Sequence, residues 1–477
     1  MQNQWIFKRL SPDEQEQQTS IANALGVSPM MAKLLVQRGI YTFDDAKSFF
    51  RPDLCQLHDP FLIKDMDKAV DRLNKACENK EKILIYGDYD VDGTTAVALV
   101  YKFLQDCGCP SQLDFYIPDR YKEGYGLSRE GVDYARDNGV KLIITLDCGI
   151  KAIERVEYAR SFGIDVIICD HHTTDETLPA AVAVLDSKRS DDTYPYKDLS
   201  GCGVGFKLMQ AFAISNGIEF SRLESLLDFV AVSIASDIVP ITGENRILAY
   251  YGIRRLNEHP SKGIKAIIDT CVPSPNAKDR KNQQQQEITM NDIVFKIGPR
   301  INASGRMKSG REVVELLVSN DDTLAEQISS NIDAYNEERR GIDKETTADA
   351  EKIVLDNGDI EDRRAIVVFN PDWHKGIVGI VASRLTEKYY KPTIVLTKAN
   401  GLVSGSARSV HGFDLYSAID SCRDLLENFG GHVYAAGLTL KEEHLQEFAQ
   451  RMDSFIAGKI NSEMLVPVID VDAKLDF

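Results

Sequence analysis

Four apolar runs in the first half of the chain each lead into aspartate. KILIY precedes a loop with three aspartates, and KLIITLD, DVIICD and AVAVLD end on one each; the residues are Asp88, Asp90, Asp92, Asp147, Asp170 and Asp186. Short apolar runs that alternate with helix-like segments predict the buried strands of a parallel sheet. Because ligands bind beyond the carboxyl ends of the strands in open α/β sheets, we expect these carboxylates to meet at one edge.

The loop YGDYDVDGTT, from Tyr86 to Thr95, has the aspartate spacing of a calcium-binding EF-hand. An EF-hand needs an acidic residue at its twelfth position, which counted from Asp88 is the apolar Leu99, so this class of site is excluded. The helical spacing of GTTAVALVYKFL after KILIY instead predicts a strand-loop-helix unit. Three aspartates this close repel one another unless a cation, protons or water compensate, so the loop indicates a metal site, with a solvated acidic turn as the alternative.

Two further segments add candidate ligands. CDHHTT places His171 and His172 after a strand-terminal aspartate, and Asp237 ends a segment with helical spacing, DFVAVSIASD. Carboxylate-rich ligation with one imidazole favours a hard divalent ion, and manganese over magnesium. Zinc held by Cys148, Cys169 and the histidines is the rival, but strand alternation turns Cys169 away from the face of the neighbouring aspartate.

The composition is that of a globular protein, with 477 residues of which 43% are hydrophobic and 27% charged. No run approaches the roughly 18 consecutive apolar residues that span a bilayer, and the amino terminus MQNQWIFKRL has no signal-peptide core, so we expect a cytoplasmic protein. The net charge of −17 argues against a protein that coats nucleic acid indiscriminately. Nine cysteines without a CxxC pair predict neither a zinc ribbon nor a disulfide framework, and we expect reduced, mostly buried thiols.

The motifs GDYDVDG, LDCG, CDHH and ASDIVP, in this order, resemble the successive motifs of the DHH phosphoesterase superfamily. Further segments resemble the RecJ family of single-strand-specific 5′ to 3′ exonucleases, namely IPDRYKEGYG, GCGVGFKL, GENR, GPRINASGRM, WHKGIVGIVASRL, SGSARS and FGGHVYAAG. The resemblance extends from about residue 70 to about residue 440. It implies a metal-dependent exodeoxyribonuclease, a hydrolase that cuts single-stranded DNA from the 5′ end in DNA repair and recombination.

The resemblance also implies the ligands of two Mn²⁺ ions, with Mg²⁺ as the alternative: Asp88, Asp90, Asp92, Asp147, His171 and Asp237. Asp147 would bridge the ions as a catalytic residue, and His172 would contact the scissile phosphate. Paired ions can orient a water in line and neutralise the charge on phosphoryl oxygens, so no covalent nucleophile is needed. We expect Asp170 to orient a histidine or cap the strand turn, and Asp186 to be structural.

Seven side chains are candidates for binding nucleic acid or phosphate: Arg120, Arg300, Asn302, Arg306, Ser406, Arg408 and His432. In PRINASGRMKSG the basic residues lie among small ones that let backbone amides approach a phosphate. In SGSARS a guanidinium fork flanked by hydroxyls suits a terminal phosphate, and the resemblance implies that this segment and Arg120 hold the 5′ end. FGGH predicts a tight turn that presents His432, with packing as the alternative role of its glycines.

The predicted fold class is α/β: a parallel-sheet DHH domain joined by a long helix to a smaller α/β DHH-associated domain, with a metal and nucleic-acid cleft between them. A narrow cleft would exclude duplex and admit one strand. The predicted ranges are 1–75 for an N-terminal helical region, 76–318 for the DHH domain, 319–356 for the connecting helix and 357–462 for the DHH-associated domain. Residues 463–477 indicate the start of an oligonucleotide-binding region whose remainder is missing, and residues 276–291 predict a surface loop.

Three alternatives to the exonuclease stay open at this point. They are a phosphoesterase for short oligonucleotides, cyclic dinucleotides or pyrophosphate, a non-catalytic replication scaffold, and a regulatory DNA-binding protein acting through the helix-turn-helix-like residues 21–40. The complete set of ligand residues argues against the scaffold. We expect single-stranded DNA with a 5′-phosphate as the substrate, a helicase and a single-strand-binding protein as partners, a monomer, and no membrane association.

Overall fold

The computed structural model describes residues 3–271, 287–356 and 363–475, so residues 276–286 of the predicted surface loop lie outside it. The chain forms two compact units, which we call the first unit (residues 47–336) and the second unit (residues 1–46 and 337–477). Within the described ranges, no helix is both long enough and apolar enough to cross a membrane.

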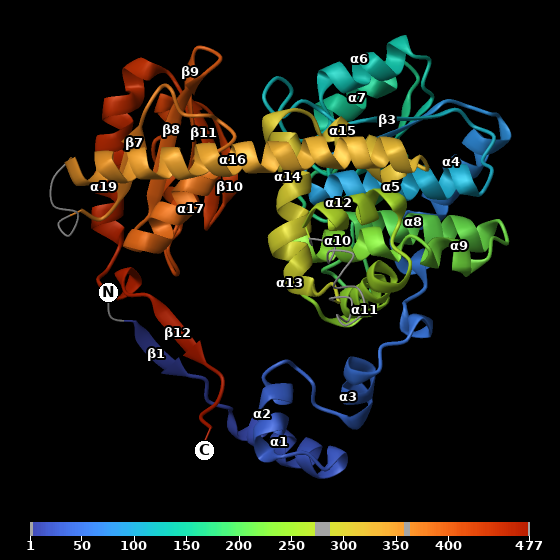
Figure 1. Ribbon diagram of the computed structural model, residues 1–477, viewed down its shortest axis with the longest axis horizontal. Helices are drawn as coiled ribbons and strands as arrows, with labels where there is room; N and C mark the ends of the chain where they lie inside the picture. The colour runs from blue at the N-terminus through green and yellow to red at the C-terminus, as the bar shows by residue number, and fades with distance from the viewer. Residues whose placement is uncertain (1–2, 272–286, 357–362, 476–477) are drawn as a thin grey trace, which may run out of the picture. The chain divides into compact units, whose positions relative to one another are not determined.

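The first unit is built on a five-stranded parallel sheet with the order β3-β2-β4-β5-β6. Figure 1 labels its edge strand β3. Its strands are β2 (Ile83–Gly87), β3 (Leu113–Tyr116), β4 (Leu142–Leu146), β5 (Asp165–Cys169) and β6 (Ala183–Leu185). β2 and β4 are buried along their whole length, as expected for parallel strands covered on both faces. Strand alternation sends Leu84 and Tyr86 into one hydrophobic core and Ile83 and Ile85 into another.

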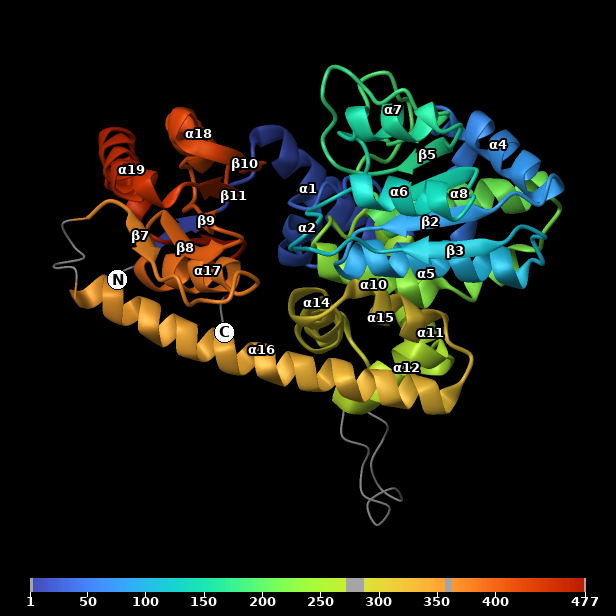
Figure 2. The same ribbon diagram turned by 90° about the horizontal axis from the view of Figure 1, so that it is seen from above.

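Helices cover both faces of this sheet (Figure 2). α6 (Arg129–Asp137) and α7 (Ile153–Ser161) pack on the face of Tyr86. The opposite face carries a larger core, formed with α4 (Met66–Glu78), α5 (Val91–Asp106), α8 (Gly201–Ser215) and α10 (Leu227–Asp237). The other helices of the unit include α9 (Phe220–Glu224), α11 (Gly243–Glu258), α12 (Lys262–Cys271), α14 (Gly298–Met307) and α15 (Gly310–Val318).

The second unit contains a mixed five-stranded sheet with the order β10-β11-β9-β8-β7. Its strands are β7 (Ile366–Phe369), β8 (Thr393–Ala399), β9 (Leu402–Arg408), β10 (Leu426–His432) and β11 (Ala435–Leu440). β7 and β8 are parallel, and the other neighbours are antiparallel. α17 (Val378–Tyr389) packs on one face, and α18 (Leu415–Asp420) and α19 (Leu445–Lys459) pack on the other.

A single helix, α16, runs unbroken from Asp322 to Asp356 and contributes residues to both units. The second unit also includes α1 (Pro12–Leu25), α2 (Pro29–Val36) and a parallel strand pair, β1 (Gln4–Phe7) with β12 (Val468–Val471), which the sequence did not predict. The parallel-sheet unit and the second α/β unit confirm the predicted fold class. The domain ranges stay a prediction, and the compact units change over at other positions, after Ala46 and Asn336.

Two local predictions are wrong. FGGH lies in strand β10, and the turn comes after it; a Cβ on Gly431 would collide with the carbonyl of Ala435, so packing explains that glycine. Cys77 and Cys109 form a disulfide, with their Cα atoms 5.8 Å apart, where reduced thiols were expected. In addition, Gly298–Met307 is the helix α14, and the expected approach of its backbone amides to a phosphate stays a prediction.

Candidate metal centre

The acidic loop joins β2 to α5, and a glycine fixes its path. A Cβ on Gly93 would lie only 2.5 Å from the backbone oxygen of Asp88, so no larger residue fits there. Asp90 is the N-cap of α5 and accepts a hydrogen bond from Gly93 N at 3.1 Å. The loop therefore folds tightly onto the helix start and holds Asp88, Asp90 and Asp92 at the carboxyl end of β2.

Asp147 follows β4 in a left-handed backbone conformation, with φ 58°. Its amide donates to the carbonyl of Cys169 at 2.9 Å, which extends the β4–β5 pairing by one residue. Gly201, the first residue of α8, approaches so closely that a Cβ there would lie 2.6 Å from Cβ of Asp147. A left-handed non-glycine residue costs about 1–3 kcal/mol and persists only where its surroundings hold it. β5 and α8 together therefore fix this carboxylate at the sheet edge.

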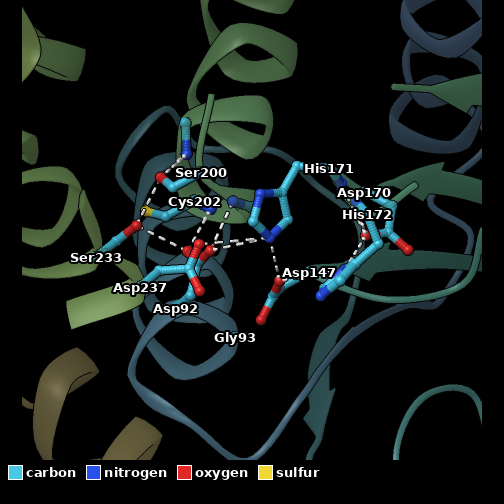
Figure 3. A network of polar contacts seen from close by, with 12 residues as sticks. Asp92, Gly93, Asp147, Asp170, His171, His172, Ser200, Cys202, Ser233 and Asp237 are labelled. Atoms are coloured by element: carbon cyan, nitrogen blue, oxygen red, sulfur yellow. Dashed lines mark hydrogen bonds and ion pairs between the residues drawn. The ribbon is translucent and has the colours of Figure 1, made fainter. Parts of the chain in front are cut away.

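Asp92, in the first turn of α5, is held by the N-terminus of α8 (Figure 3). Its Oδ2 accepts from Gly201 N, and its Oδ1 accepts from Cys202 N and from Ser233 Oγ, each at 2.7 Å. Ser200, the N-cap of α8, accepts from the same Ser233 hydroxyl at 2.7 Å. A helix N-terminus favours a carboxylate because its first amides have no partner inside the helix. Asp92 is thus bound in one orientation.

His171 lies among three carboxylates from different elements (Figure 3). Its Nε2 is 3.1 Å from Oδ1 of Asp147, 3.6 Å from Oδ2 of Asp237 and 3.7 Å from Oδ2 of Asp92. Asp237 is the last residue of α10, and the following Ile238 ends the helix in the left-handed conformation with φ 60°. Side chains from β4, α5 and α10 therefore gather around one imidazole nitrogen.

Asp170 orients His172 and caps the end of β5. Its Oδ1 accepts from Nδ1 of His172 at 2.8 Å and from the amide of His171 at 2.7 Å. Its Oδ2 accepts from the amide of Ile150 at 2.9 Å. Since Nδ1 is engaged with Asp170, Nε2 is the ring nitrogen of His172 that can face a substrate.

The site has buried polar atoms that lack a hydrogen-bond partner among the described residues: Oδ1 of Asp88, Oδ1 of Asp147, Oδ2 of Asp237 and both ring nitrogens of His171. Unsatisfied buried acceptors are costly, so their concentration at one place calls for a ligand. Donor atoms within 4.8 Å of one another form three groups: Asp88, Asp90 and Asp147; Asp92, His171 and Asp237; and Asp147, His171 and His172. Carboxylate oxygens with one or two imidazoles fit a hard divalent cation such as Mn²⁺ or Mg²⁺.

The titration behaviour of these groups agrees with a cation site. Burial, and then the nearby charge of Asp92, raise the pKa of Asp147 well above its ordinary value. Burial and the charge of Asp90 do the same for the pKa of Asp88. Burial, followed by the charge of Asp92, raises the pKa of Asp237 to about 8. Burial lowers the pKa of His171, which favours the neutral imidazole that binds metals. A cation would replace the protons that these carboxyl groups otherwise hold.

The two members of the Asp170–His172 pair shift in opposite directions. Burial opposes both shifts, but the hydrogen bond between the two side chains raises the pKa of His172 and lowers the pKa of Asp170. The pair therefore favours a cationic imidazole beside an ionised carboxylate.

The loop between β3 and α6 contributes two side chains to this region. The guanidinium of the predicted Arg120 lies 4.7 Å from the ring centre of Tyr89 in the acidic loop. The hydroxyl of Tyr125 donates to the carbonyl of Asp147 at 2.7 Å and lies 3.2 Å from Nδ1 of His172. Sequence reasoning missed Tyr125; its signal was the GYG spacing, since the glycines on both sides have positive φ.

The helix α14 carries three of the residues predicted to bind phosphate: Arg300, Asn302 and Arg306. Nε of Arg300 donates to Oδ1 of Asp333 at 2.8 Å, so this guanidinium already has an anionic partner inside the unit. Arg306 accepts a short hydrogen bond at its carbonyl from the hydroxyl of Tyr121, and Asn302 is half-buried. Their proposed contacts with phosphate stay predictions.

Ser406, Arg408 and His432 lie together on one sheet of the second unit. Arg408 pairs with Ala435 across β9 and β11, and Ala435 pairs with His432 across β11 and β10. Nη1 of Arg408 donates to Oγ of Ser406 at 2.8 Å. A Cβ on Gly379, in the first turn of α17, would lie 3.2 Å from that Oγ, so the helix start closely approaches the pair.

The zinc alternative receives no support. Cys148 and Cys169 are fully buried, and burial raises the pKa of both thiols, which disfavours thiolate ligands. Asp186 is also buried, and its Oδ1 accepts from the amide of Lys188 at 2.8 Å, a local structural contact.

Sequence reasoning also missed the network behind Asp92. The segment LSGCGVGF contains the signal, because a serine before a helical segment is a typical N-cap. Ser233 gave none, since a serine inside the apolar helix α10 is not distinguishable by spacing from a packing residue.

Two family models match the chain. One, described as the DHH family, N-terminal domain, matches residues 82–234. The other, described as the DHHA1 domain, matches residues 362–458. The first match contains the acidic loop, the Asp147 turn and the histidine pair, and the second contains Ser406, Arg408 and His432.

Curated relatives extend the similarity over almost the whole chain. The single-stranded-DNA-specific exonuclease RecJ of Bacillus subtilis is 38% identical over 470 residues, which cover 98% of this chain and 57% of that protein. The protein of the same description from Dickeya dadantii is 34% identical over 463 residues, covering 94% of this chain and 78% of its own length. A crystal structure of RecJ from Thermus thermophilus in complex with Mn²⁺ has a TM-score of 0.81 at 26% identity, covering 98% of this chain and 64% of that one. This chain thus spans somewhat more than half of the first of these relatives.

Proposed function

Because this chain belongs to the RecJ family of DHH proteins, we propose that it is a metal-dependent exonuclease that hydrolyses single-stranded DNA from the 5′ end. The observation that carries the proposal is the gathering of Asp92, Asp147 and Asp237 around His171, with Asp88 and Asp90 beside Asp147 and with buried acceptor atoms left for a cation. A RecJ crystal structure bound to Mn²⁺ and another bound to Mg²⁺ support a divalent cation here too.

Two Mn²⁺ ions are the proposed occupants. Two of the three donor groups would hold them: Asp88, Asp90 and Asp147 for one ion, and Asp92, His171 and Asp237 for the other. Bound divalent cations would supply Lewis-acid chemistry, polarising the phosphodiester and offsetting the negative charge that builds on its oxygens. Asp147 shares one donor group with Asp88 and Asp90 and another with His171 and His172, and its Oδ1 lies 3.1 Å from Nε2 of His171, so it would contribute to holding both ions.

The chain's own residues would orient the substrate and stabilise its charge. His172, held by Asp170, would donate from Nε2 to an oxygen of the scissile phosphate. Although burial opposes it, the hydrogen bond to Asp170 raises the pKa of His172, which favours the cationic form of this donor. Tyr125, through its hydrogen bond to the Asp147 carbonyl, would keep the turn after β4 in place.

We assign the 5′-phosphate to Ser406 and Arg408 of the second unit. A guanidinium that already donates to a neighbouring hydroxyl is fixed in direction, which suits recognition of a terminal phosphate. Only the small Ala435 lies between Arg408 and His432 in the strand register.

The test is digestion of a 5′-phosphorylated single strand with Mn²⁺ by the parent and by Asp147→Asn. The expected loss is more than about a hundredfold, since changes even to residues that only support metal ligands cost about 10–100-fold. Asp165→Asn is the matched control. Asp165 is the first residue of β5, at the end of the strand away from the site, and it pairs with Arg72. Equal digestion of blunt duplex would contradict single-strand specificity. A preference for dinucleotides over long strands would favour the alternative small-substrate phosphoesterase.

A further inference from the structure

The open face of β10 and β11 has a floor of very small residues. Paired residues on antiparallel strands point to the same face, so the row His432, Ala435 and Arg408 shares one face with the row Gly430, Gly437 and Ser406. A Cβ placed on Gly430 would meet no described atom within 4 Å, and Gly437 is exposed. β11 is the middle strand, and at these two positions it carries only Ala435 and Gly437. No side chain larger than a methyl group therefore lies between His432 of β10 and Arg408 of β9.

An aromatic pair stands at the end of this floor. Tyr434 lies in the turn between β10 and β11, and His411 follows β9 by three residues. Their rings are nearly parallel, with 12° between the planes and 6.5 Å between the centroids. The carbonyl of Tyr434 accepts from the amide of Ser409 at 2.9 Å, which fixes the turn next to the end of β9, where Arg408 lies. The side chain of Tyr434 is 50% exposed, and His411 is exposed as well.

We propose that Tyr434 and His411 form a stacking platform for a nucleobase of the strand whose phosphate lies at Ser406 and Arg408. This inference rests on the proposed function and adds a base-binding subsite to it. Aromatic rings stack on any base, because every base has a π face, so the platform would strengthen binding without selecting a sequence. Exposed rings next to the end of β9, where Arg408 lies, would place a flat apolar surface close to an anion site.

The negative net charge of the chain is a reason to expect contacts with DNA that do not depend on charge. With a net charge of −17, the chain as a whole repels a polyanion at long range. Attraction to single-stranded DNA must then come from local contacts, and base stacking is one that does not depend on overall charge.

The experiment measures the affinity of full-length protein for a 5′-phosphorylated oligonucleotide by fluorescence anisotropy. All proteins carry Asp147→Asn, which prevents digestion during the measurement. Tyr434→Ala should weaken binding about tenfold, because the base would lose its stacking partner. Tyr434→Trp should restore the affinity, because it returns an aromatic ring. Tyr250→Ala is the matched control, since Tyr250 is also 50% exposed but lies on α11 in the first unit.

A set of strands with one abasic nucleotide, moved stepwise from the 5′ end, identifies stacking directly. At one position the abasic strand should bind the parent more weakly, and Tyr434→Ala should cause no further loss on that strand. If Tyr434→Ala leaves every affinity unchanged, or weakens intact and abasic strands equally at every position, the platform is refuted while the exonuclease proposal stands. If the parent does not bind single strands at all, the proposed function fails and the platform fails with it. Circular dichroism of each variant checks that the fold is kept.

Discussion

Among single residues, Asp92 depends most on its neighbours, because both of its oxygens accept hydrogen bonds inside the first unit. Two come from amides of α8, which no side-chain substitution removes, and the third comes from Ser233. Oδ2 accepts only one of the three and faces His171 at 3.7 Å. The supporting contacts therefore bind mainly Oδ1 and leave Oδ2 directed at the centre of the site.

Ser233→Ala removes this donor and should weaken Mn²⁺ binding by about 10–100-fold, as is typical when a residue that orients a metal ligand is lost. Ser236→Ala is the matched control: it makes the same change on the same helix, and the hydroxyl of Ser236 has no hydrogen-bond partner in the described structure. Titration of the metal-free protein with Mn²⁺, followed by electron paramagnetic resonance, measures both affinities. Equal affinities of the two variants would show that the α8 amides alone orient Asp92.

The raised pKa values at the site predict a pH-dependent effect of the metal on stability. In the metal-free fold, burial and neighbouring carboxylates raise the pKa of Asp237 to about 8, above its value of about 3.9 in an unfolded chain. The proton on this group therefore contributes stability below pH 4, and that contribution is lost as the pH rises through about 8. Mn²⁺ takes the place of the proton, so the rise in Tm on adding Mn²⁺ should be larger at pH 8.5 than at pH 6. Differential scanning fluorimetry measures the rise in Tm on adding Mn²⁺. A rise that does not depend on pH would contradict the role of Asp237 as a metal ligand.

At the scale of elements, the position of α14 controls the acidic loop. Gly305 lies in this helix, and a Cβ there would collide with the carbonyl of Tyr89, the residue between Asp88 and Asp90. The helix and the loop are therefore in backbone contact, which explains why a glycine occurs where helix propensity disfavours it.

Gly305→Ala should destabilise the protein by about 1–3 kcal/mol, as overpacking of a close contact does, and should also weaken Mn²⁺ binding because the loop must move. Gly341→Ala is the control in an exposed part of α16, where the added Cβ would meet no described atom within 4 Å. That change should stabilise by up to about 1 kcal/mol, because alanine is the better helix former. Urea unfolding measures the change in the free energy of unfolding of each variant. If Gly305→Ala leaves that free energy unchanged, α14 can shift away from the loop at little cost.

These elements also show which parts of the fold could be predicted from the sequence and which could not. The strands of the first unit and the aspartates at their ends were predictable, because a buried parallel strand is a continuous apolar run and its carboxyl end is marked by the first polar residue. The strand β10 was mistaken for a turn because Gly431 is required by close approach of the neighbouring strand β11, whereas a single sequence shows glycine only as a sign of a turn. The helix α14 was not foreseen, because Gly305 is required by close approach of the backbone of Tyr89, which lies far away in the sequence. The pairing of Cys77 with Cys109 spans 32 residues, and spacing alone does not determine such a connection.

For the molecule as a whole, the excess of acidic residues predicts a weak dependence of DNA binding on salt. Four arginines are assigned to nucleic acid: Arg120, Arg300, Arg306 and Arg408. Four phosphate contacts on a single strand would correspond to a slope of about −3 in a plot of log affinity against log salt concentration.

Arg408→Gln should reduce the steepness of that slope by about 0.7, the share of one phosphate contact. Arg254→Gln, an exposed change on α11 outside the proposed site, should leave it unaltered. Anisotropy titrations between low and high salt concentrations give the slopes. A parent slope steeper than about −4 would require basic contacts beyond those assigned here.

The strand β1 can pair with β12 only after residues 468–471 have been synthesised. Gln4 and Val468 are partners in that ladder, although 464 residues separate them. At a synthesis rate of about 5–20 residues per second, the first strand waits roughly 20–90 s on the ribosome before its partner exists. During that interval Trp5 and Phe7, which stay largely exposed even in the finished fold, are open to chaperones and to other nascent chains.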